Sequence, residues 1–177
     1  MRIVGGKYKG RIFKPNKKFK SRPTTDQAKE GLFNILENRY NFSDKTVLDL
    51  FSGTGSMAYE FLSRGCKNIL LIEKNYHHVR FIHEVLKSLG AENARVVKTD
   101  VFKYLYHNPE KFDIVFADPP FDLPYLGKIP KAIFTSGVLI PNGLFILEHS
   151  KEHSFLSHPN FTEIRNYGKV NFSFFKA

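Results

Sequence analysis

One short run, Asp118-Pro119-Pro120-Phe121, carries the residue types best suited to chemistry. It follows an apolar segment, Phe112–Phe116, which has the composition of a buried strand. Proline has a fixed φ and no N–H, so a Pro-Pro pair cannot continue a central strand. The run therefore predicts a carboxylate and an aromatic ring at the carboxyl end of a strand, the edge at which open α/β sheets bind ligands.

These four residues suit the activation of an exocyclic amine on a planar base. The nitrogen of such an amine is a poor nucleophile, because its lone pair is delocalised into the ring. The Asp118 carboxylate and the Pro119 carbonyl can accept hydrogen bonds from its two N–H groups and so direct the lone pair at an electrophile, while Pro120 stiffens the turn. Phe121 can stack on the base, a contact worth roughly 1–3 kcal/mol. A plain strand end with a core Phe is the simpler interpretation, and four residues alone are only moderately specific.

Four acidic residues end predicted strands in succession. Asp49 lies in Thr46–Leu50, Glu73 ends Asn68–Glu73, Asp100 follows Arg95–Lys98, and Asp118 follows the strand described above. Because parallel strands share the edge at which they end, we expect these acids to line one rim of the sheet.

The glycine turn Gly53-x-Gly55-x-x-Ala58 indicates a bound nucleotide-like cofactor. With Glu73 placed to accept from ribose hydroxyls, NAD is one candidate. Asp49 argues against NAD, because a carboxylate beside the turn would repel a pyrophosphate. S-adenosylmethionine carries an ammonium, a ribose and an adenine but no phosphate, so Asp49 suits it, and Asp100 can accept from its adenine amine. We therefore predict S-adenosylmethionine as the cofactor and S-adenosylhomocysteine as the product.

Helices and strands alternate around these residues. Thr24 and Gln27 fit a capping box that opens a helix with an apolar face, predicted to end near Tyr40. Gly65 and Gly90 are placed to end two further helices. A fifth strand, Gly143–Leu147, leads to Glu148, and the tail from Phe161 reads as an antiparallel hairpin.

The amino-terminal part of the chain is strongly basic. The formal net charge is +10, nine Lys or Arg precede residue 23, and the first acid is Asp26. Such a charge favours nucleic acid as the partner; an anionic membrane surface is the alternative, but no basic amphipathic helix is evident. Residues 1–14 predict a β-hairpin whose Lys7, Lys9 and Arg11 alternate onto one face, with Tyr8 between them.

Length and composition limit the number of domains, the cellular location and the kinds of site to be expected. A chain of 177 residues with 42% hydrophobic content is most simply one soluble domain. No apolar run reaches the length of a membrane span, and the first residues do not form a signal peptide. The single cysteine, Cys66, fits a reducing compartment, so a cytoplasmic location is expected. The seven histidines show no metal-ligand spacing, and no metal is predicted.

Several segments resemble a known family. Asp49-Leu50-Phe51-Ser52-Gly53-Thr54-Gly55 is similar to the first motif of class I methyltransferases, and Asp118–Phe121 to their amino-methylating motif. The amino-terminal blocks 2–11, 22–26 and 32–36 resemble the bacterial small-subunit rRNA guanine-N2 methyltransferases of the RsmD type. The resemblance covers nearly the whole chain, with Ser52 and Cys66 as mild departures.

The resemblance implies an α/β, Rossmann-like class I methyltransferase fold: a seven-stranded, mostly parallel sheet in the order 3-2-1-4-5-7-6, with an amino-terminal β-hairpin and helix. It implies one domain over 1–177, with a basic RNA-binding extension at 1–24, a helix at 25–40 and a catalytic core at 45–177. The implied catalytic residues are Asp118, Pro119, Pro120 and Phe121. The implied cofactor-binding residues are Asp49, Phe51, Ser52, Gly53, Thr54, Gly55, Glu73, Lys74, Asp100 and Val101. The implied RNA-binding residues are Arg2, Lys7, Tyr8, Lys9, Arg11, Arg22 and Thr24.

The implied activity is methyl transfer from S-adenosylmethionine to the exocyclic N2 of one guanine in 16S rRNA, within the small ribosomal subunit or an assembly intermediate, by a monomer. A DNA adenine-N6 methyltransferase is the nearest alternative, although no separate target-recognition domain is evident. A non-catalytic RNA-binding or assembly protein on the same fold is another, and an NAD oxidoreductase a third. The segment 124–137 is a possible lid over the base pocket.

Overall fold

A single twisted sheet of seven strands organises the computed structural model, which describes residues 1–15, 24–107 and 110–177. The strand order is β3-β2-β1-β4-β5-β7-β6, as predicted. Strands β1 to β5 are parallel, and β7 runs antiparallel to both of its neighbours. The strands are β1 Thr46–Leu50, β2 Asn68–Glu73, β3 Ala94–Lys98, β4 Phe112–Ala117, β5 Leu139–Ser150, β6 Phe161–Tyr167 and β7 Val170–Lys176.

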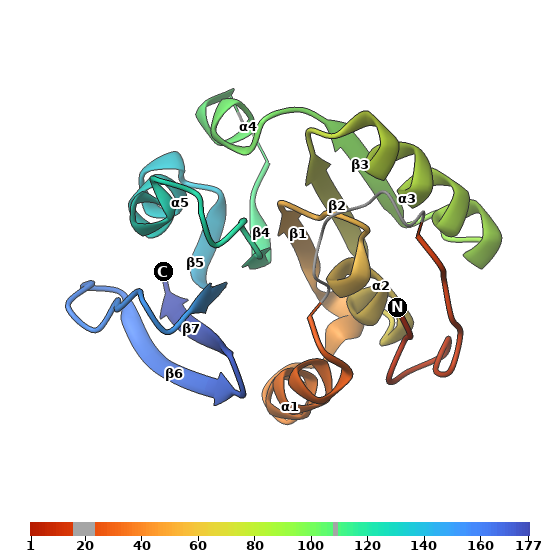
Figure 1. The fold of residues 1–177 in the computed structure, drawn as a ribbon, viewed down its shortest axis with the longest axis horizontal. Helices are drawn as coiled ribbons and strands as arrows, with labels where there is room; N and C mark the ends of the chain where they lie inside the picture. The colour runs from red at the N-terminus through yellow and green to blue at the C-terminus, as the bar shows by residue number, and fades with distance from the viewer. Residues whose placement is uncertain (16–23, 108–109) are drawn as a thin grey trace.

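Helices cover both faces of this sheet (Figure 1). Alternate residues of β1 show the arrangement: Val47 packs with α1, α2 and α3 on one face, whereas Leu48 packs with α4 and α5 on the other. Because the central strands are buried on both faces, they are mainly apolar and do not alternate between apolar and polar residues. The helices are α1 Asp26–Glu37, η1 Phe42–Asp44, α2 Ser56–Ser63, α3 Tyr76–Leu89, α4 Val101–His107, η2 Leu126–Lys128 and α5 Ile129–Ser136. None in the described part of the chain is long and apolar enough to cross a membrane.

The first helix begins one residue later than the sequence suggested. Thr25 is its N-cap, and the Thr25 hydroxyl accepts a hydrogen bond from the Ala28 N–H at 3.2 Å. The predicted capping box with Thr24 is therefore wrong, because the Thr24 hydroxyl is bonded to Glu148 instead. The helix ends at Glu37 instead of near Tyr40.

The amino-terminal segment forms a hairpin, but a shorter one than predicted. A single antiparallel bridge joins Arg2 to Ile12, and residues 5–10 are turns and bends. Gly6 and Gly10 both have positive φ, and the Lys9 N–H donates to the Gly6 carbonyl at 3.1 Å. The predicted alternation of Lys7, Lys9 and Arg11 along an extended strand is therefore wrong, since the chain turns where the strand was expected.

A buried ion-pair network holds this segment on the core. Glu60 is 0% exposed, and its carboxylate contacts Lys29 Nζ at 3.0 Å and Arg64 Nη1 at 2.7 Å. The Val4 N–H donates to the same carboxylate at 3.0 Å. Lys29 also donates to the carbonyl of Arg2, and the Arg64 guanidinium lies 4.1 Å from the centre of the Phe33 ring. The network thus ties residues 2–4 to α1 and α2.

Most of segment 124–137 is not available as a lid. Residues 126–136 form η2 and α5, whose Leu126, Ile129 and Ile133 are 0% exposed against the sheet. Only the turn from Phe121 to Tyr125 reaches the surface beside the site described next. The assignment of separate functions to parts of the chain stays a prediction.

Candidate active site

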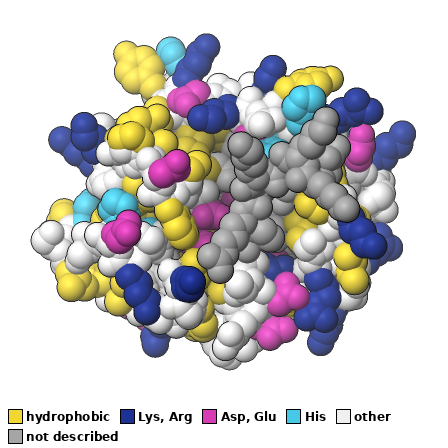
Figure 2. Space-filling model, viewed as in Figure 1, with side chains coloured by type: hydrophobic (Ala, Val, Ile, Leu, Met, Phe, Trp, Pro, Cys, Tyr) yellow, Lys and Arg dark blue, Asp and Glu magenta, His cyan; other side chains and the backbone are white. Residues whose placement is uncertain are grey.

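A cavity of about 1240 Å³ opens at the carboxyl ends of β1, β2, β4 and β5. Figure 2 shows acidic side chains gathered in the middle of this face of the molecule. Small-molecule pockets typically hold roughly 300–1,000 Å³, so this cavity has room for more than one ligand. All four predicted strand-end acids line it: Asp49, Glu73, Asp100 and Asp118.

The cavity gathers almost all of the residues predicted to act in catalysis or to bind the cofactor. The whole run from Asp118 to Phe121 lines it, and so do nine of the ten residues predicted to bind the cofactor, which are Asp49, Phe51, Ser52, Gly53, Thr54, Glu73, Lys74, Asp100 and Val101. Gly55 is the exception. It has φ 81° and precedes α2, and a Cβ there would lie 2.6 Å from the Tyr59 ring, so its role is to let the turn pack on α2.

Glu73 fixes the glycine turn at one end of the cavity. Its Oε2 accepts from the Gly53 N–H at 2.8 Å, and its Oε1 from the Asn75 N–H at 2.7 Å. Burial acts to raise its pKa, but hydrogen bonds from His78, Asn75 and Gly53 outweigh burial and hold the pKa below its ordinary value. The carboxylate is therefore ionised and held in place, and its remaining lone pairs can accept from ribose hydroxyls.

Asp49 lies beside that turn with an unsatisfied oxygen. The side chain is 2% exposed, and its Oδ2 has no hydrogen-bond partner among the described residues. Burial first, and the nearby Glu73 charge to a lesser degree, raise its pKa to about 8. A buried acceptor of this kind is costly unless a donor reaches it. An ammonium group in the cavity would supply that donor, so the residues present fit S-adenosylmethionine.

Asp100 and three aromatic rings shape the adjoining wall. Asp100 Oδ1 accepts from the N–H groups of Phe102 and Lys103, at 2.9 and 3.2 Å, and so caps α4. The ring of Phe102 lies 6.4 Å from that of Phe51 and 5.2 Å from that of Tyr125, both edge-on. This apolar wall can hold a flat ring, while the second Asp100 oxygen can accept from an amine on it.

The Asp118 turn follows β4 and lines the same cavity, and β1 lies between β4 and the strand that ends at Glu73. The Asp118 side chain is half-buried, Pro119 is buried, and the Phe121 ring is 39% exposed. Burial, followed by the charges of Glu148 and Asp49, raises the pKa of Asp118 well above its ordinary value. Because Phe121 keeps an open face, it can stack on an incoming base, as the sequence suggested.

Glu148 is a site residue that sequence reasoning missed. It lies near the end of β5, is 3% exposed, and lines the same cavity as Asp118. The Thr24 hydroxyl donates to its Oε2 at 2.7 Å. Burial is the main cause that raises its pKa to about 7. The sequence carried the signal, an acid at the end of a fifth strand, but the rim was predicted to hold only four.

The predicted RNA-binding residues fall into two groups. Arg2, Lys7, Lys9 and Arg11 are exposed, whereas Thr24 is buried and lines the cavity, where it donates to Glu148. Arg22 lies outside the described residues.

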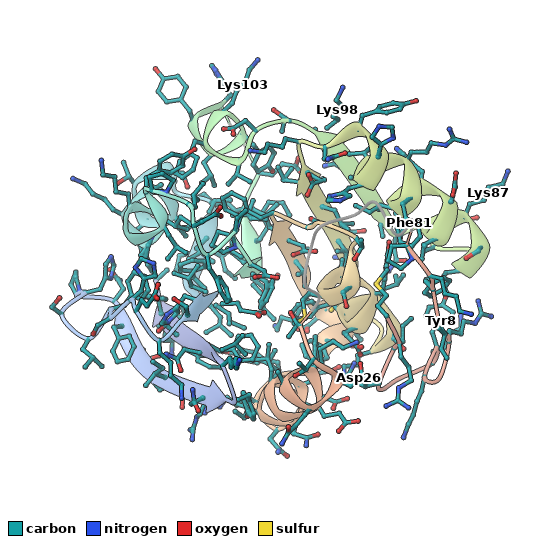
Figure 3. All side chains as sticks on the ribbon, in the orientation of Figure 1. Tyr8, Asp26, Phe81, Lys87, Lys98 and Lys103 are labelled. Carbon is teal, nitrogen blue, oxygen red and sulfur yellow. The ribbon has the colours of Figure 1, made fainter. Side chains whose placement is uncertain are left out.

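Tyr8 anchors the basic turn to α3. Its hydroxyl donates to the Leu89 carbonyl at 3.0 Å, and Lys7 and Arg11 lie 5.2 and 5.3 Å from the centre of its ring. Figure 3 shows Tyr8 at the same edge of the molecule as Lys87 of α3. The ring therefore groups basic side chains on one edge, although Tyr8 itself is committed to packing.

The residues that the structure describes contain no group of three His, Cys, Asp or Glu side chains placed to hold a metal ion.

Comparison with known proteins agrees with this geometry. The family model described as "Conserved hypothetical protein 95" matches residues 1–176. Ribosomal RNA small subunit methyltransferase D of Escherichia coli K12 is 33% identical over 159 residues, which cover 90% of this chain and 79% of that protein.

Solved structures share the fold. Hypothetical protein TTHA0928 of Thermus thermophilus superposes with a TM-score of 0.88 at 29% identity, over 100% of this chain and 99% of that one. SMU.776 complexed with SAH superposes with a TM-score of 0.67 at 18% identity, over 84% of this chain and 49% of that one. At this identity the likeness shows the fold alone. The fold is thus the Rossmann-like class I methyltransferase fold. The chain belongs to the family described as "Conserved hypothetical protein 95", the family of the RsmD-type methyltransferases.

Proposed function

We propose that this protein transfers a methyl group from S-adenosylmethionine to the exocyclic N2 of a guanine in small-subunit rRNA. One observation carries the proposal: a single cavity holds both a buried, unpaired acid beside a glycine turn and an Asp-Pro-Pro-Phe turn with an open aromatic face. The first feature suits an ammonium-bearing cofactor and the second a planar base with an amine. Family membership and the 33% identity to a named small-subunit rRNA methyltransferase support the choice of substrate.

The residues of the chain chiefly position the reactants. S-adenosylmethionine, when bound, supplies an electrophilic methyl group on a sulfonium. Asp49, Glu73 and Asp100 would hold its ammonium, ribose and adenine, and thereby direct the methyl group toward Asp118. Orienting two reactants in line in this way can lower a barrier by roughly 7–11 kcal/mol.

Asp118 would act on the amine itself. Its carboxylate and the Pro119 carbonyl accept the two N–H bonds, so the lone pair faces the methyl group. The nitrogen becomes cationic as the N–CH₃ bond forms and the S–CH₃ bond breaks, and Asp118 then accepts one proton from it. Its raised pKa makes the carboxylate a better proton acceptor than an ordinary aspartate.

Methyl transfer from labelled S-adenosylmethionine tests the proposal. Small subunits, naked rRNA and duplex DNA are offered side by side to the wild type and to Asp118→Ala. We expect label in guanine N2 of small-subunit rRNA, a loss of about 10³-fold or more in kcat for the variant, and an unchanged Kd for the cofactor. Label in adenine of DNA would favour the DNA methyltransferase, and cofactor binding without any transfer would favour the non-catalytic RNA-binding protein.

The cellular context is part of the same proposal. The exposed side chains of Lys7, Lys9 and Arg11 suit a phosphate backbone, whereas Arg2 is already paired with Asp26. A cytoplasmic monomer that acts on an assembled or assembling subunit fits this surface and the single buried cysteine. Sedimentation of the protein with and without purified small subunits measures both the oligomeric state and the binding.

A further inference from the structure

Glu148 is placed where a base must enter. Leu147 of β5 pairs with Ala117 of β4, so the next residues, Glu148 and Asp118, are neighbours across two parallel strands. Both line the cavity, and the Glu148 charge acts on Asp118. Adjacent strands are roughly 4.8 Å apart, which lets two carboxylates reach neighbouring groups on one edge of a single base.

The acids at this part of the cavity, Asp49, Asp118 and Glu148, have few hydrogen-bond donors. In the described ranges, no Lys or Arg forms an ion pair with Asp49, Asp118 or Glu148, and the hydrogen bond recorded for the Glu148 carboxylate comes from Thr24. A buried carboxylate beside like charges is unfavourable unless further donors reach it. The base-binding end of the cavity is therefore built to receive a ligand with several N–H groups on one edge.

Guanine has that edge. Its Watson–Crick side presents N1–H and the two N–H bonds of N2, three donors in a row, whereas adenine presents its amine beside N1, which is an acceptor. Asp118 already accepts from the reacting amine in the proposed reaction. A second carboxylate next to it would meet N1–H of guanine favourably and the N1 lone pair of adenine unfavourably.

We propose that Glu148, oriented by Thr24, accepts the N1–H of the target guanine and so determines the choice of guanine over bases with an unprotonated N1. This inference rests on the proposed function, and it adds a specificity-determining residue to it. Thr24 donates to Oε2, which leaves Oε1 for the base. The same bond ties the start of α1 to the pocket, so the amino-terminal part of the chain takes part in base selection.

A change of base preference tests the proposal, because a merely structural role would not produce one. The wild type and Glu148→Gln are compared on small subunits carrying guanine or 2-aminopurine at the mapped target nucleotide. 2-Aminopurine keeps the reacting amine but has an acceptor at N1. The side-chain amide of Gln can donate to that acceptor while its oxygen still accepts from Thr24.

We expect the wild type to prefer guanine by about 10²-fold in kcat/KM, since one base contact is worth roughly 1–3 kcal/mol. Glu148→Gln should shift the ratio at least about tenfold toward 2-aminopurine, with the cofactor Kd unchanged. An unchanged ratio would overturn the proposal, and so would loss of activity on both bases with cofactor binding intact. If the wild type methylates no guanine N2 in the small subunit, the proposed function fails instead.

Thr24→Val gives an independent test if Glu148→Gln does not fold. Without the Thr24 hydroxyl, Glu148 loses its orientation, so kcat/KM for guanine should fall about tenfold while that for 2-aminopurine stays the same. An equal fall on both bases would overturn the proposal. Glu84→Gln, on the exposed face of α3, serves as the matched control.

Discussion

Glu60 and Glu148 are both almost fully shielded from solvent, at 0% and 3% exposed, but their surroundings are opposite. Glu60 contacts Lys29 and Arg64 and accepts from the Val4 N–H. Glu148 faces Asp118, and among the described residues its recorded donor is the hydroxyl of Thr24. The comparison separates two uses of a buried charge. A charge paired within the chain stabilises the fold, whereas a charge left without a cation at a cavity keeps its capacity for a ligand.

Glu60→Gln should have the largest effect. Glu60 is the buried partner of both cations, and without its charge the ion-pair partners left among the described residues are Asp26 for Lys29 and Glu37 for Arg64, both of which are more exposed. Breaking a buried pair typically costs about 3–5 kcal/mol, and these remaining partners place the cost at or below the lower end of that range. We expect the free energy of unfolding to fall by that amount in urea titrations, whereas Glu84→Gln, whose ion pair with Arg80 is exposed, should lower it by less than about 0.5 kcal/mol. A Glu60 variant as stable as the wild type would show that the network does not hold the amino-terminal segment.

Asp49→Asn should weaken cofactor binding without lowering stability, whereas Glu60→Gln should lower stability. A hydrogen bond to a charged group contributes about 1.5–3 kcal/mol, so the Kd for S-adenosylmethionine should rise by roughly 10- to 100-fold. The Tm of the free protein should not fall, because a buried carboxylate with an unsatisfied oxygen has been replaced by a neutral amide. Calorimetric titration and thermal melts measure the two quantities, and a lowered Tm with unchanged binding would assign Asp49 to the fold.

The unpaired acids also predict how stability depends on pH. The folded-state pKa is raised to about 8 for Asp49 and about 7 for Glu148, so the folded protein binds more protons than the unfolded chain between about pH 4 and 8. Stability should therefore fall as pH rises through this range, between pH 5 and pH 8 by at most about 4 kcal/mol from Asp49 and about 3 kcal/mol from Glu148, since one pKa unit corresponds to about 1.4 kcal/mol. Urea midpoints at both pH values measure the change. In Glu148→Gln the decrease in the urea midpoint between the two pH values should be smaller. A midpoint that rises with pH in both the variant and the wild type would contradict the raised pKa values.

Charges on the surface should have the smallest effect. Replacing Lys7, Lys9 and Arg11 by Gln should lower the slope of log K against log salt for RNA binding by about 1 for each phosphate that these side chains neutralise in the wild type. The stability should barely change, since all three side chains are exposed. Neutralising Lys128, Lys131 and Lys151 alters the net charge equally on another part of the molecule. Equal slopes for the two triple variants would show that RNA binds elsewhere.

Sequence reasoning succeeded where the determining interactions are local. The apolar runs of the parallel strands, the glycine turn and the Pro-Pro stop are each specified by a few consecutive residues, so the strands and the acidic rim were both anticipated. The strand order came from the family resemblance and is confirmed. It failed where distant parts of the chain meet. Thr25 rather than Thr24 caps α1 because Thr24 is bonded to a residue 124 positions away. The same bond explains why Glu148 looked like an ordinary strand residue until β5 was seen beside β4.

The walls of the cavity come from very different points along the chain. Its lining includes the carboxyl ends of β1 and β2, the start of α4, Tyr125 and Glu148, and also the turn between β6 and β7, at Tyr167 to Val170. Gly31 of α1 packs so closely on Tyr167 that a Cβ there would lie 2.1 Å from its ring. Because the lining runs from Thr24 to Val170, the cavity cannot be complete until the last hairpin of the sheet has been synthesised and has packed on α1.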